Sequence, residues 1–176
     1  MTAPVIRPVA PGDLAAITAI YGEAVFFGSA SFEIEPPPAE EMARRCETIT
    51  AAGFPYLVAE IEGRVIGYAY AGPYRPRPAY RFTVEDSIYL DQAARGLGIG
   101  RLLLTALIER TTAMGMRQMI AVIGDSANLP SIRLHEALGF ERAGLLRSVG
   151  WKHGRWIDSV LMQRSLGPGD GLSPAA

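Results

Sequence analysis

The stretch FPYLVAEIEGRVIGYAYAGPY, residues 54–74, constrains the fold more than any other part of the chain. It holds two apolar runs with the composition of β-strands, and Glu62-Gly63 separates them. Such a pair is typical of a tight hairpin turn, because glycine readily adopts the left-handed backbone conformation that the turn needs. We therefore expect the sheet of this protein to contain a central antiparallel hairpin.

Helical and strand patterns alternate on both sides of the hairpin. Some segments carry apolar residues at helical spacing, and short β-branched or aromatic runs lie between them. We expect further strands at 5–9, 81–90, 117–124, 140–147 and 155–163, and helices at 11–27, 39–52, 99–114 and 128–138. The loops at 28–38 and 75–80 contain prolines that stop the neighbouring elements. This order predicts a mixed α/β (α+β) fold.

The 176 residues suit one domain, which we assign to residues 1–166, and we expect the tail GPGDGLSPAA, residues 167–176, to be disordered. The net charge of −1 gives no general attraction to nucleic acid or to an anionic membrane surface. No apolar run approaches the roughly 20 residues of a membrane span. The N-terminus lacks the pattern of a secretory signal and Cys46 is the only cysteine, so we expect a cytoplasmic protein.

A glycine-rich segment, ARGLGIGRLLL, immediately precedes the helix expected at 99–114. The first turn of a helix leaves backbone N–H groups without partners, and the glycines let the main chain approach a bulky anion. Together with the helix dipole, these groups favour a phosphate or pyrophosphate site, and Arg95 and Arg101 add positive charge nearby. On glycine count alone, a turn that merely starts the helix is an equally good interpretation. The spacing matches neither a P-loop nor the dinucleotide-binding fingerprint.

The helix after the glycines should anchor on the sheet through one apolar face. We expect that face to consist of Ile99, Leu102, Leu103, Ala106 and Leu107. The helix at 128–138 has a capping residue, Asn128, at its start.

The strand RFTVEDSIYL has one apolar face and one polar face. Strand alternation puts Thr83, Glu85, Ser87 and Tyr89 together on the polar face. Asp86 then falls on the apolar face, and a β-bulge near Glu85-Asp86 would resolve this conflict. A partly buried Glu85 would have a raised pKa and could serve as a general base. The alternative is an edge-strand glutamate held in a salt bridge.

Several stretches resemble the GNAT superfamily of N-acetyltransferases. ARGLGIGRLLL resembles its acyl-CoA signature, and AVIGDSANLPSIRLHEALGF and GWKHGRWIDSVLMQ resemble one branch, the phosphinothricin and methionine sulfone or sulfoximine N-acetyltransferases. The resemblance runs from about residue 6 to residue 163. It implies a GNAT fold, with a mixed, mostly antiparallel sheet of about 6–7 strands flanked by about 4 helices. It also implies acetyl-CoA as co-substrate, a homodimer, and a small amino-acid-like acceptor of the phosphinothricin, methionine sulfone or methionine sulfoximine type, which links the branch to herbicide or antibiotic resistance. The sequence itself gives no metal site, because its two histidines are separated and its one cysteine is distant from both.

The resemblance implies a donor site around the glycine loop. The loop backbone would hold the CoA pyrophosphate, and the end of the preceding strand would pair with the pantetheine arm. The family separates this strand from the next one, here 119–123, and the acyl thioester lies in the gap. Asn128 would contact the arm or the thiol, or act as a helix cap alone. The implied donor-site residues are Ile88, Tyr89, Leu90, Arg95, Gly96, Leu97, Gly98, Ile99, Gly100, Arg101 and Asn128.

The resemblance also implies catalytic and acceptor residues. Glu85 matches the proposed general base of the branch, acting directly or through water. His135 stands where the wider superfamily carries a tyrosine that protonates the thiolate, so it could be a second base, the thiolate acid or a structural hydrogen-bonding group. Acceptor recognition falls to Phe32, Arg75, Arg77, Tyr80 and Ser87.

Other interpretations of these residues stay open. Phe32 could be a core residue, and the two arginines could belong to a solvated basic loop. Trp156 could complete the site of a partner subunit or simply pack beside a turn.

Three functions remain in competition at this stage. The first is transfer of acetyl to the α-amino group of a small amino-acid analogue, directly within a ternary complex. The second is an acetyltransferase for a protein or peptide amine, which the arginine-rich acceptor loop suits less well. The third is a non-catalytic acyl-CoA sensor, which would need the glycine loop but not Glu85.

Overall fold

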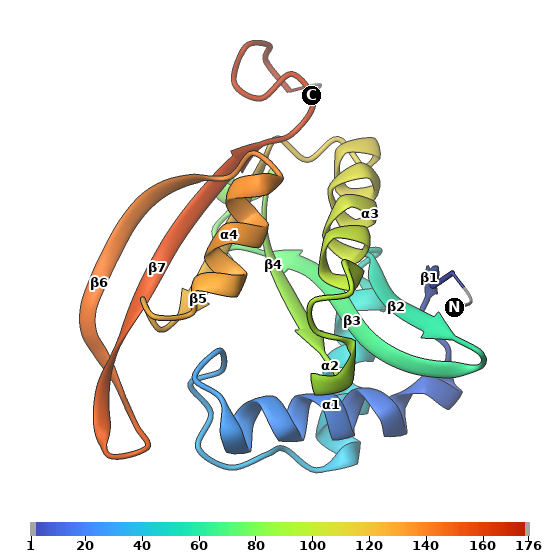
Figure 1. The fold of residues 1–176 in the computed structure, drawn as a ribbon. Helices are drawn as coiled ribbons and strands as arrows, with labels where there is room; N and C mark the ends of the chain where they lie inside the picture. The colour runs from blue at the N-terminus through green and yellow to red at the C-terminus, as the bar shows by residue number, and fades with distance from the viewer. Residues whose placement is uncertain (1–2, 175–176) are drawn as a thin grey trace.

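The computed structural model describes residues 3–174 and contains one open seven-stranded sheet with helices on both faces (Figure 1). The strands lie in the order β1-β2-β3-β4-β5-β7-β6. Their bounds are β1 Val5–Pro8, β2 Tyr56–Ile61, β3 Arg64–Pro73, β4 Thr83–Leu90, β5 Gln118–Gly124, β6 Glu141–Lys152 and β7 Arg155–Ser165. The helices are α1 Leu14–Phe27, α2 Ala39–Ala51, α3 Ile99–Ala113 and α4 Leu129–Ala137, with short 3-10 turns at Pro11–Asp13, Pro78–Tyr80 and Gln92–Ala94.

The pairing of the strands confirms the predicted mixed and mostly antiparallel sheet. Every neighbouring pair is antiparallel except β4 and β5, which run parallel. The predicted hairpin is formed by β2 and β3, and its turn residues Glu62 and Gly63 have φ of 51° and 77°. The left-handed conformation that the Glu-Gly pair predicted is therefore present.

Two apolar layers cover the sheet. Side chains of α1 and α2, such as Ile17, Val25 and Met42, pack with Tyr68 on one face. The other face carries the larger cluster, in which helices α3 and α4 pack against Val84, Met119 and their neighbours. Because side chains alternate along a strand, Val84 and Ile88 of β4 belong to one layer and Tyr89 to the other. In β3 the alternation is interrupted between Ile66 and Tyr68, where the register with β2 shifts.

The buried face of α3 differs from our prediction at one position. Leu103 and Leu107 are fully buried as expected, but the side chain of Leu102 is 44% exposed and Leu104 is buried instead. The buried stripe follows Leu103, Leu107 and Thr111 and includes Leu104 and Ile108, whereas Leu102 lies on the outer side of the helix.

The strands β4 and β5 separate partway along their length. They pair from Thr83↔Gln118 to Asp86↔Ala121, after which β4 and β5 continue without pairing to each other. This opening was expected from the family resemblance.

The β-bulge that we predicted near Glu85-Asp86 is not formed against β3. The register between β3 and β4 runs without a shift from Gly67↔Leu90 to Pro73↔Val84. The bulge prediction is therefore wrong for this strand pair. A partner on α4 accommodates the Asp86 carboxylate instead.

The hairpin of β6 and β7 forms a curved arm at one edge of the sheet (Figure 1). Its register shifts between Arg142 and Gly144 and again between Leu146 and Gly150. Most of β6 is exposed. Within the described residues, no helix has the length and apolar character to cross a membrane. Residues 167–171 form turns beyond β7, and residues 175–176 of the tail predicted to be disordered lie outside the described part.

Candidate active site

The glycine loop leads directly into α3. Gly96 and Gly98 have φ of 78° and 79°, a conformation that strains any residue with a Cβ. Gly98 is the N-cap of α3 and has no side chain with which to cap it. A Cβ built at either glycine meets no atom within 4 Å, so the space above the loop is open, and Arg95 and Arg101 are exposed beside it. The loop therefore offers free N–H groups, open space and positive charge, which suit a pyrophosphate.

A small cavity lies where β4 and β5 separate. Its volume is about 50 Å³. Four predicted site residues, Ser87, Ile88, Tyr89 and Asn128, line it together with His135. The remaining lining residues are Ala30, Asp86, Ala121, Val122, Ile123, Gly124 and Ser131. Residues far apart in sequence, which we assigned to the donor site and to catalysis, thus meet at one opening in the sheet.

Asn128 both caps a helix and lies at the cavity, two features that we had treated as alternatives. Its Oδ1 accepts a hydrogen bond from the Ser131 N–H at 3.4 Å, so it caps α4. Its side chain also lines the cavity. A capping residue can therefore border the donor site, and the two roles do not exclude each other.

His135 and Asp86 form a buried pair between α4 and β4. The side chains of His135 and Asp86 are only 2% and 1% exposed, and His135 Nε2 lies 3.1 Å from Asp86 Oδ2. The other ring nitrogen, Nδ1, donates to the Ser131 carbonyl oxygen at 2.8 Å. Burial lowers the pKa of His135, but the hydrogen bond and charge of Asp86 more than offset it, so the pKa lies above its ordinary value. Both ring nitrogens are occupied, which leaves neither free to contact a ligand.

Glu85 lies on the opposite face of β4 from Asp86. It is half-buried and pairs with Gly72 of β3. Burial raises the pKa of Glu85, the neighbouring Asp86 raises it further, and Arg75 partly offsets the rise. Since β4 lies between β3 and β5, Glu85 is not on an edge strand. Among the described residues it has no ion-pair partner within 4 Å, so the salt-bridge interpretation finds no support.

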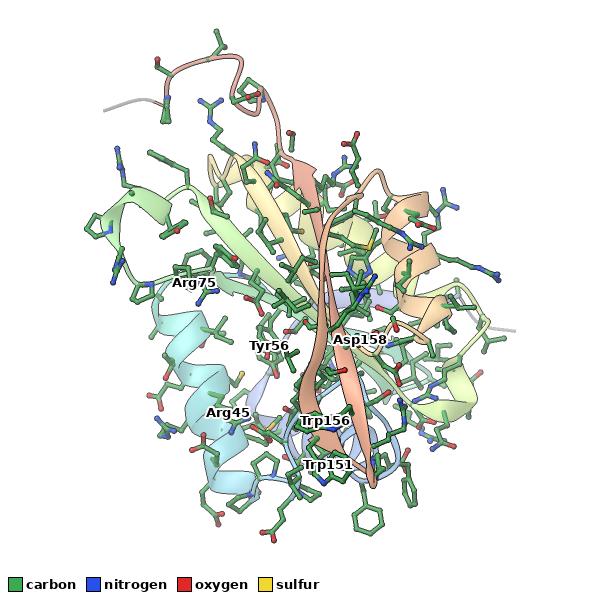
Figure 2. The ribbon with its side chains drawn as sticks, turned by 90° about the vertical axis from the view of Figure 1, so that its left-hand side faces the viewer. Arg45, Tyr56, Arg75, Trp151, Trp156 and Asp158 are labelled. Carbon is green, nitrogen blue, oxygen red and sulfur yellow. The ribbon has the colours of Figure 1, made fainter. Side chains whose placement is uncertain are left out.

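The space beside Glu85 is bounded by tyrosines on one side and open on the other. A Cβ built at Gly72 meets no atom within 4 Å. Tyr70 pairs with Ser87 across the strands, and its ring stacks on Tyr56 with centroids 5.0 Å apart. Figure 2 shows Tyr56 beside α2, with Arg75 nearer the end of the sheet. The carboxylate therefore borders a space in which an acceptor amine could approach.

The predicted acceptor loop follows β3 and is exposed. The guanidinium of Arg75 lies 5.0 Å above the Tyr74 ring, and Tyr74 meets Tyr80 edge-to-face at 5.7 Å. Arg75 is the loop residue whose charge acts on Glu85, while Arg77 is exposed at the base of the same loop. All three predicted loop residues are exposed, and Arg75 is the one whose charge reaches Glu85.

Phe32 is neither free nor part of the main core. Its side chain is 39% exposed and covers two glycines, because Cβ atoms built at Gly150 and Gly124 would lie 2.5 Å and 2.9 Å from its ring. These glycines stand on β6 and at the end of β5. Phe32 thus connects the loop after α1 with the β6–β7 arm.

Several polar groups that we did not single out hold the same loop in place. Lys152, buried near the tip of the arm, donates from Nζ to the Ser31 carbonyl oxygen at 2.7 Å, and burial lowers its pKa. Asp125 Oδ2 accepts from Ser29 Oγ at 2.8 Å and pairs with Arg155. The sequence signal that could have revealed them is weak: a lysine inside an otherwise aromatic hairpin, and an aspartate directly after a buried strand.

Comparisons with known proteins agree on one family. The domain family described as "Acetyltransferase (GNAT) domain" matches residues 6–161. A phosphinothricin N-acetyltransferase of Alcaligenes faecalis is 56% identical over 96% of this chain and 86% of its own. An L-methionine sulfoximine/L-methionine sulfone acetyltransferase of Pseudomonas aeruginosa is 43% identical over 93% of this chain and 95% of its own.

The fold comparison gives the same result. The crystal structure of a GNAT superfamily phosphinothricin acetyltransferase from Sinorhizobium meliloti, in complex with AcCoA, superposes with a TM-score of 0.96. The two sequences are 55% identical, and the match covers 99% of this chain and 94% of the other.

Proposed function

Since the chain belongs to the acetyltransferase (GNAT) family and is an N-acetyltransferase, we propose that it moves acetyl from acetyl-CoA to the α-amino group of a small amino-acid analogue. We propose acceptors of the phosphinothricin, methionine sulfone or methionine sulfoximine type. One observation carries the proposal: Glu85 borders open space on one face of β4, while the donor cavity opens beside the same strand.

The described residues fit a CoA-type donor. The free N–H groups at the start of α3 and the exposed Arg95 and Arg101 would hold the pyrophosphate, and the end of β4 would pair with the arm. Beyond Asp86, β4 stays paired with β3 but no longer pairs with β5. This supports the assignment, because the side of a strand without a neighbour has free hydrogen-bonding groups. Acetyl-CoA supplies an acyl group already activated as a thioester.

Glu85 acts as the general base in this proposal. An amino acid carries an ammonium group at neutral pH, and that group must lose a proton before its nitrogen can attack. A half-buried carboxylate with a raised pKa is a better acceptor for that proton than an ordinary surface glutamate. Glu85 takes the proton directly or through one water molecule.

Direct transfer within a ternary complex suits the position of the only cysteine. Cys46 is buried between α2 and the tyrosine-bearing face of the sheet, and burial raises the pKa of its thiol. A thiol with a raised pKa is a poor nucleophile, which disfavours an acyl-enzyme at Cys46.

The acceptor site combines Arg75, Arg77, Tyr80 and Ser87 with the aromatic ring of Phe32. Arginine can bind a carboxylate or phosphinate through two parallel hydrogen bonds. Arg75 is the better placed of the two arginines, because its charge already acts on Glu85. For His135, the two occupied ring nitrogens favour the structural hydrogen-bonding role over direct contact with the acceptor or the thiolate.

The two competing functions are separated by one assay. We would measure CoA release with methionine sulfone, methionine sulfoximine, phosphinothricin and a lysine peptide as acceptors. Turnover on a small analogue but not on the peptide supports the proposal, and the reverse supports a peptide acetyltransferase. Tight acetyl-CoA binding without turnover on any acceptor points to a sensor.

We further propose that the chain forms a homodimer through the arm. Figure 2 shows Trp151 and Trp156 near the tip of this hairpin, where they are 57% and 61% exposed and meet edge-to-face at 5.2 Å. Val149, Leu146 and Leu145 on β6 are also exposed, so the arm carries several large apolar side chains at its surface. Sedimentation velocity should give a dimer for the wild-type chain and a monomer for Val149→Glu.

A further inference from the structure

Strand β4 carries two adjacent carboxylates that point to opposite faces of the sheet. Glu85 shares its face with Ser87, and Asp86 shares the other face with Val84, which belongs to the core under α3 and α4. The proposed chemistry uses Glu85 and leaves Asp86 without a role. A buried carboxylate is costly, because an ionised group loses its hydration when it enters the interior.

Only one of the two Asp86 oxygens is satisfied. Oδ2 faces His135 Nε2 at 3.1 Å, whereas Oδ1 is buried and has no hydrogen-bond partner among the described residues. Asp86 also lines the cavity between β4 and β5 and is the last β4 residue that pairs with β5. An unsatisfied carboxylate oxygen thus stands at the point where the two strands separate.

His135 fixes the orientation of this carboxylate. Its Nδ1 is bound to the Ser131 carbonyl oxygen at 2.8 Å, and its ring packs edge-to-face on Phe140 with centroids 4.9 Å apart. A ring held by these contacts restricts rotation of the Asp86 side chain, so the carboxylate of this cavity-lining residue keeps its orientation.

The group that Oδ1 would receive is an N–H donor. An ionised carboxylate only accepts hydrogen bonds. The arm of a CoA thioester offers two amide N–H groups and one hydroxyl as donors, whereas its carbonyl oxygens and thioester sulfur offer none. The hydroxyl stands at the pyrophosphate end of the arm, and the amides lie nearer the thioester that would occupy the gap. Of the donor's groups that could enter the gap, an amide N–H therefore complements Oδ1.

We propose that Asp86 binds the acyl donor by accepting a hydrogen bond from an amide N–H of the pantetheine arm, and that His135 is its positioning residue. The two carboxylates of β4 then have separate roles. Glu85 accepts the proton of the acceptor amine, and Asp86 binds the arm of the donor. This inference rests on the proposed function only in assuming that the donor's arm enters the gap between β4 and β5.

The test compares two probes by isothermal titration calorimetry. CoA contains the pantetheine arm. Adenosine 3′,5′-bisphosphate contains most of the nucleotide part of CoA but lacks the arm. Asp86→Asn keeps the shape and a hydrogen bond to His135 but removes the charge. We expect it to weaken CoA binding about tenfold, since a charge-assisted hydrogen bond becomes a neutral one. Binding of the bisphosphate should stay within about twofold of wild type.

Glu85→Gln is the matched control, because it makes the same chemical change one residue away on the opposite face. It should leave CoA binding within about twofold of wild type. A second variant, His135→Gln, releases the carboxylate and should weaken CoA binding by a smaller factor than Asp86→Asn. In steady-state assays Asp86→Asn should raise the KM for acetyl-CoA and leave the KM for the acceptor unchanged.

Two outcomes overturn the inference. One is that Asp86→Asn binds CoA as tightly as wild type. The other is that Asp86→Asn weakens the binding of CoA and of the bisphosphate equally, because Asp86 would then act on the nucleotide part of the donor and not on its arm. A wild-type chain that does not bind CoA at all would instead refute the proposed function.

Discussion

Replacing Glu85 with glutamine removes the carboxylate and keeps the volume of the side chain. The wild-type carboxylate is half-buried, its pKa is raised by burial and by Asp86, and among the described residues it lacks an ion-pair partner. Loss of a general base lowers the rate by about 10²–10⁴-fold, or about 2.7–5.4 kcal/mol in transition-state stabilisation. We therefore expect kcat/KM to fall by at least about 10²-fold.

The same change should not destabilise the fold. A carboxyl group whose folded pKa lies above its unfolded value is less easily ionised in the folded state, so at pH 7 its charge opposes folding. The glutamine variant should thus be as stable as wild type or slightly more stable. Thermal unfolding measures this, and Glu109→Gln, an exposed change on α3, is the control for both activity and stability.

The pH dependence provides an independent check. Glu85 must be ionised to accept a proton, so activity should fall as the pH drops through its pKa, at a pH above the ordinary 4.5 of a glutamate. Because Arg75 holds the pKa of Glu85 down, Arg75→Ala should move this acid limb to higher pH. Wild-type kcat/KM in Glu85→Gln, or an activity loss that only follows a lower melting temperature, would refute the argument.

Four further predictions follow from neighbouring features. Gly72→Val should raise the acceptor KM at least about tenfold without altering the acetyl-CoA KM, because its side chain enters the open space beside Glu85; equal change in both constants would contradict this. Gly98→Ala should lower the free energy of unfolding in urea by about 1–2 kcal/mol, whereas Gly12→Ala, at an ordinary φ, should not. The pKa of His135 is raised in the folded state, so the stability that its pairing with Asp86 adds is complete below pH 6.5 and is lost as the pH rises through the folded pKa. His135→Gln should therefore flatten the dependence of the free energy of unfolding on pH, measured by urea titration. An unchanged dependence would rule out the pair as its source. Trp151→Ala should weaken the dimer in sedimentation experiments, and an unchanged dimer would exclude the arm as the interface.

Local features of the sequence predicted most of the fold. The Glu62-Gly63 turn, the glycines before α3 and the cap at Asn128 depend on contacts within a few residues, and each is present in the structure. The helix boundaries followed for the same reason, but β6, predicted at 140–147, continues to Lys152 beyond a register shift between Leu146 and Gly150. The order of the strands was not predicted, because nothing local shows that β7 inserts between β5 and β6.

The errors occurred where long-range contacts outweigh local pattern. Leu102 fits an apolar stripe as well as Leu104 does, and only the sheet beneath α3 decides which of them is buried. Asp86 seemed to require a bulge, because alternation placed a charge in an apolar layer. A histidine 49 residues away supplies the partner that keeps the strand regular.

The sequence by itself determined the family and fold class of this protein, and its glycine-rich helix start is where we expect the donor to bind. A tight turn, a glycine-rich helix start and alternating strands are consequences of backbone stereochemistry, and neighbouring residues suffice to specify them. The tertiary structure alone decided the surroundings of the two carboxylates of β4. In the folded chain Glu85 borders open space, and Asp86 faces the buried His135. Lys152, from the distant arm, donates a hydrogen bond to the loop that carries Phe32. The physical reason is that burial and pairing of a charge depend on every element that packs around it, and those elements come together only in the folded chain.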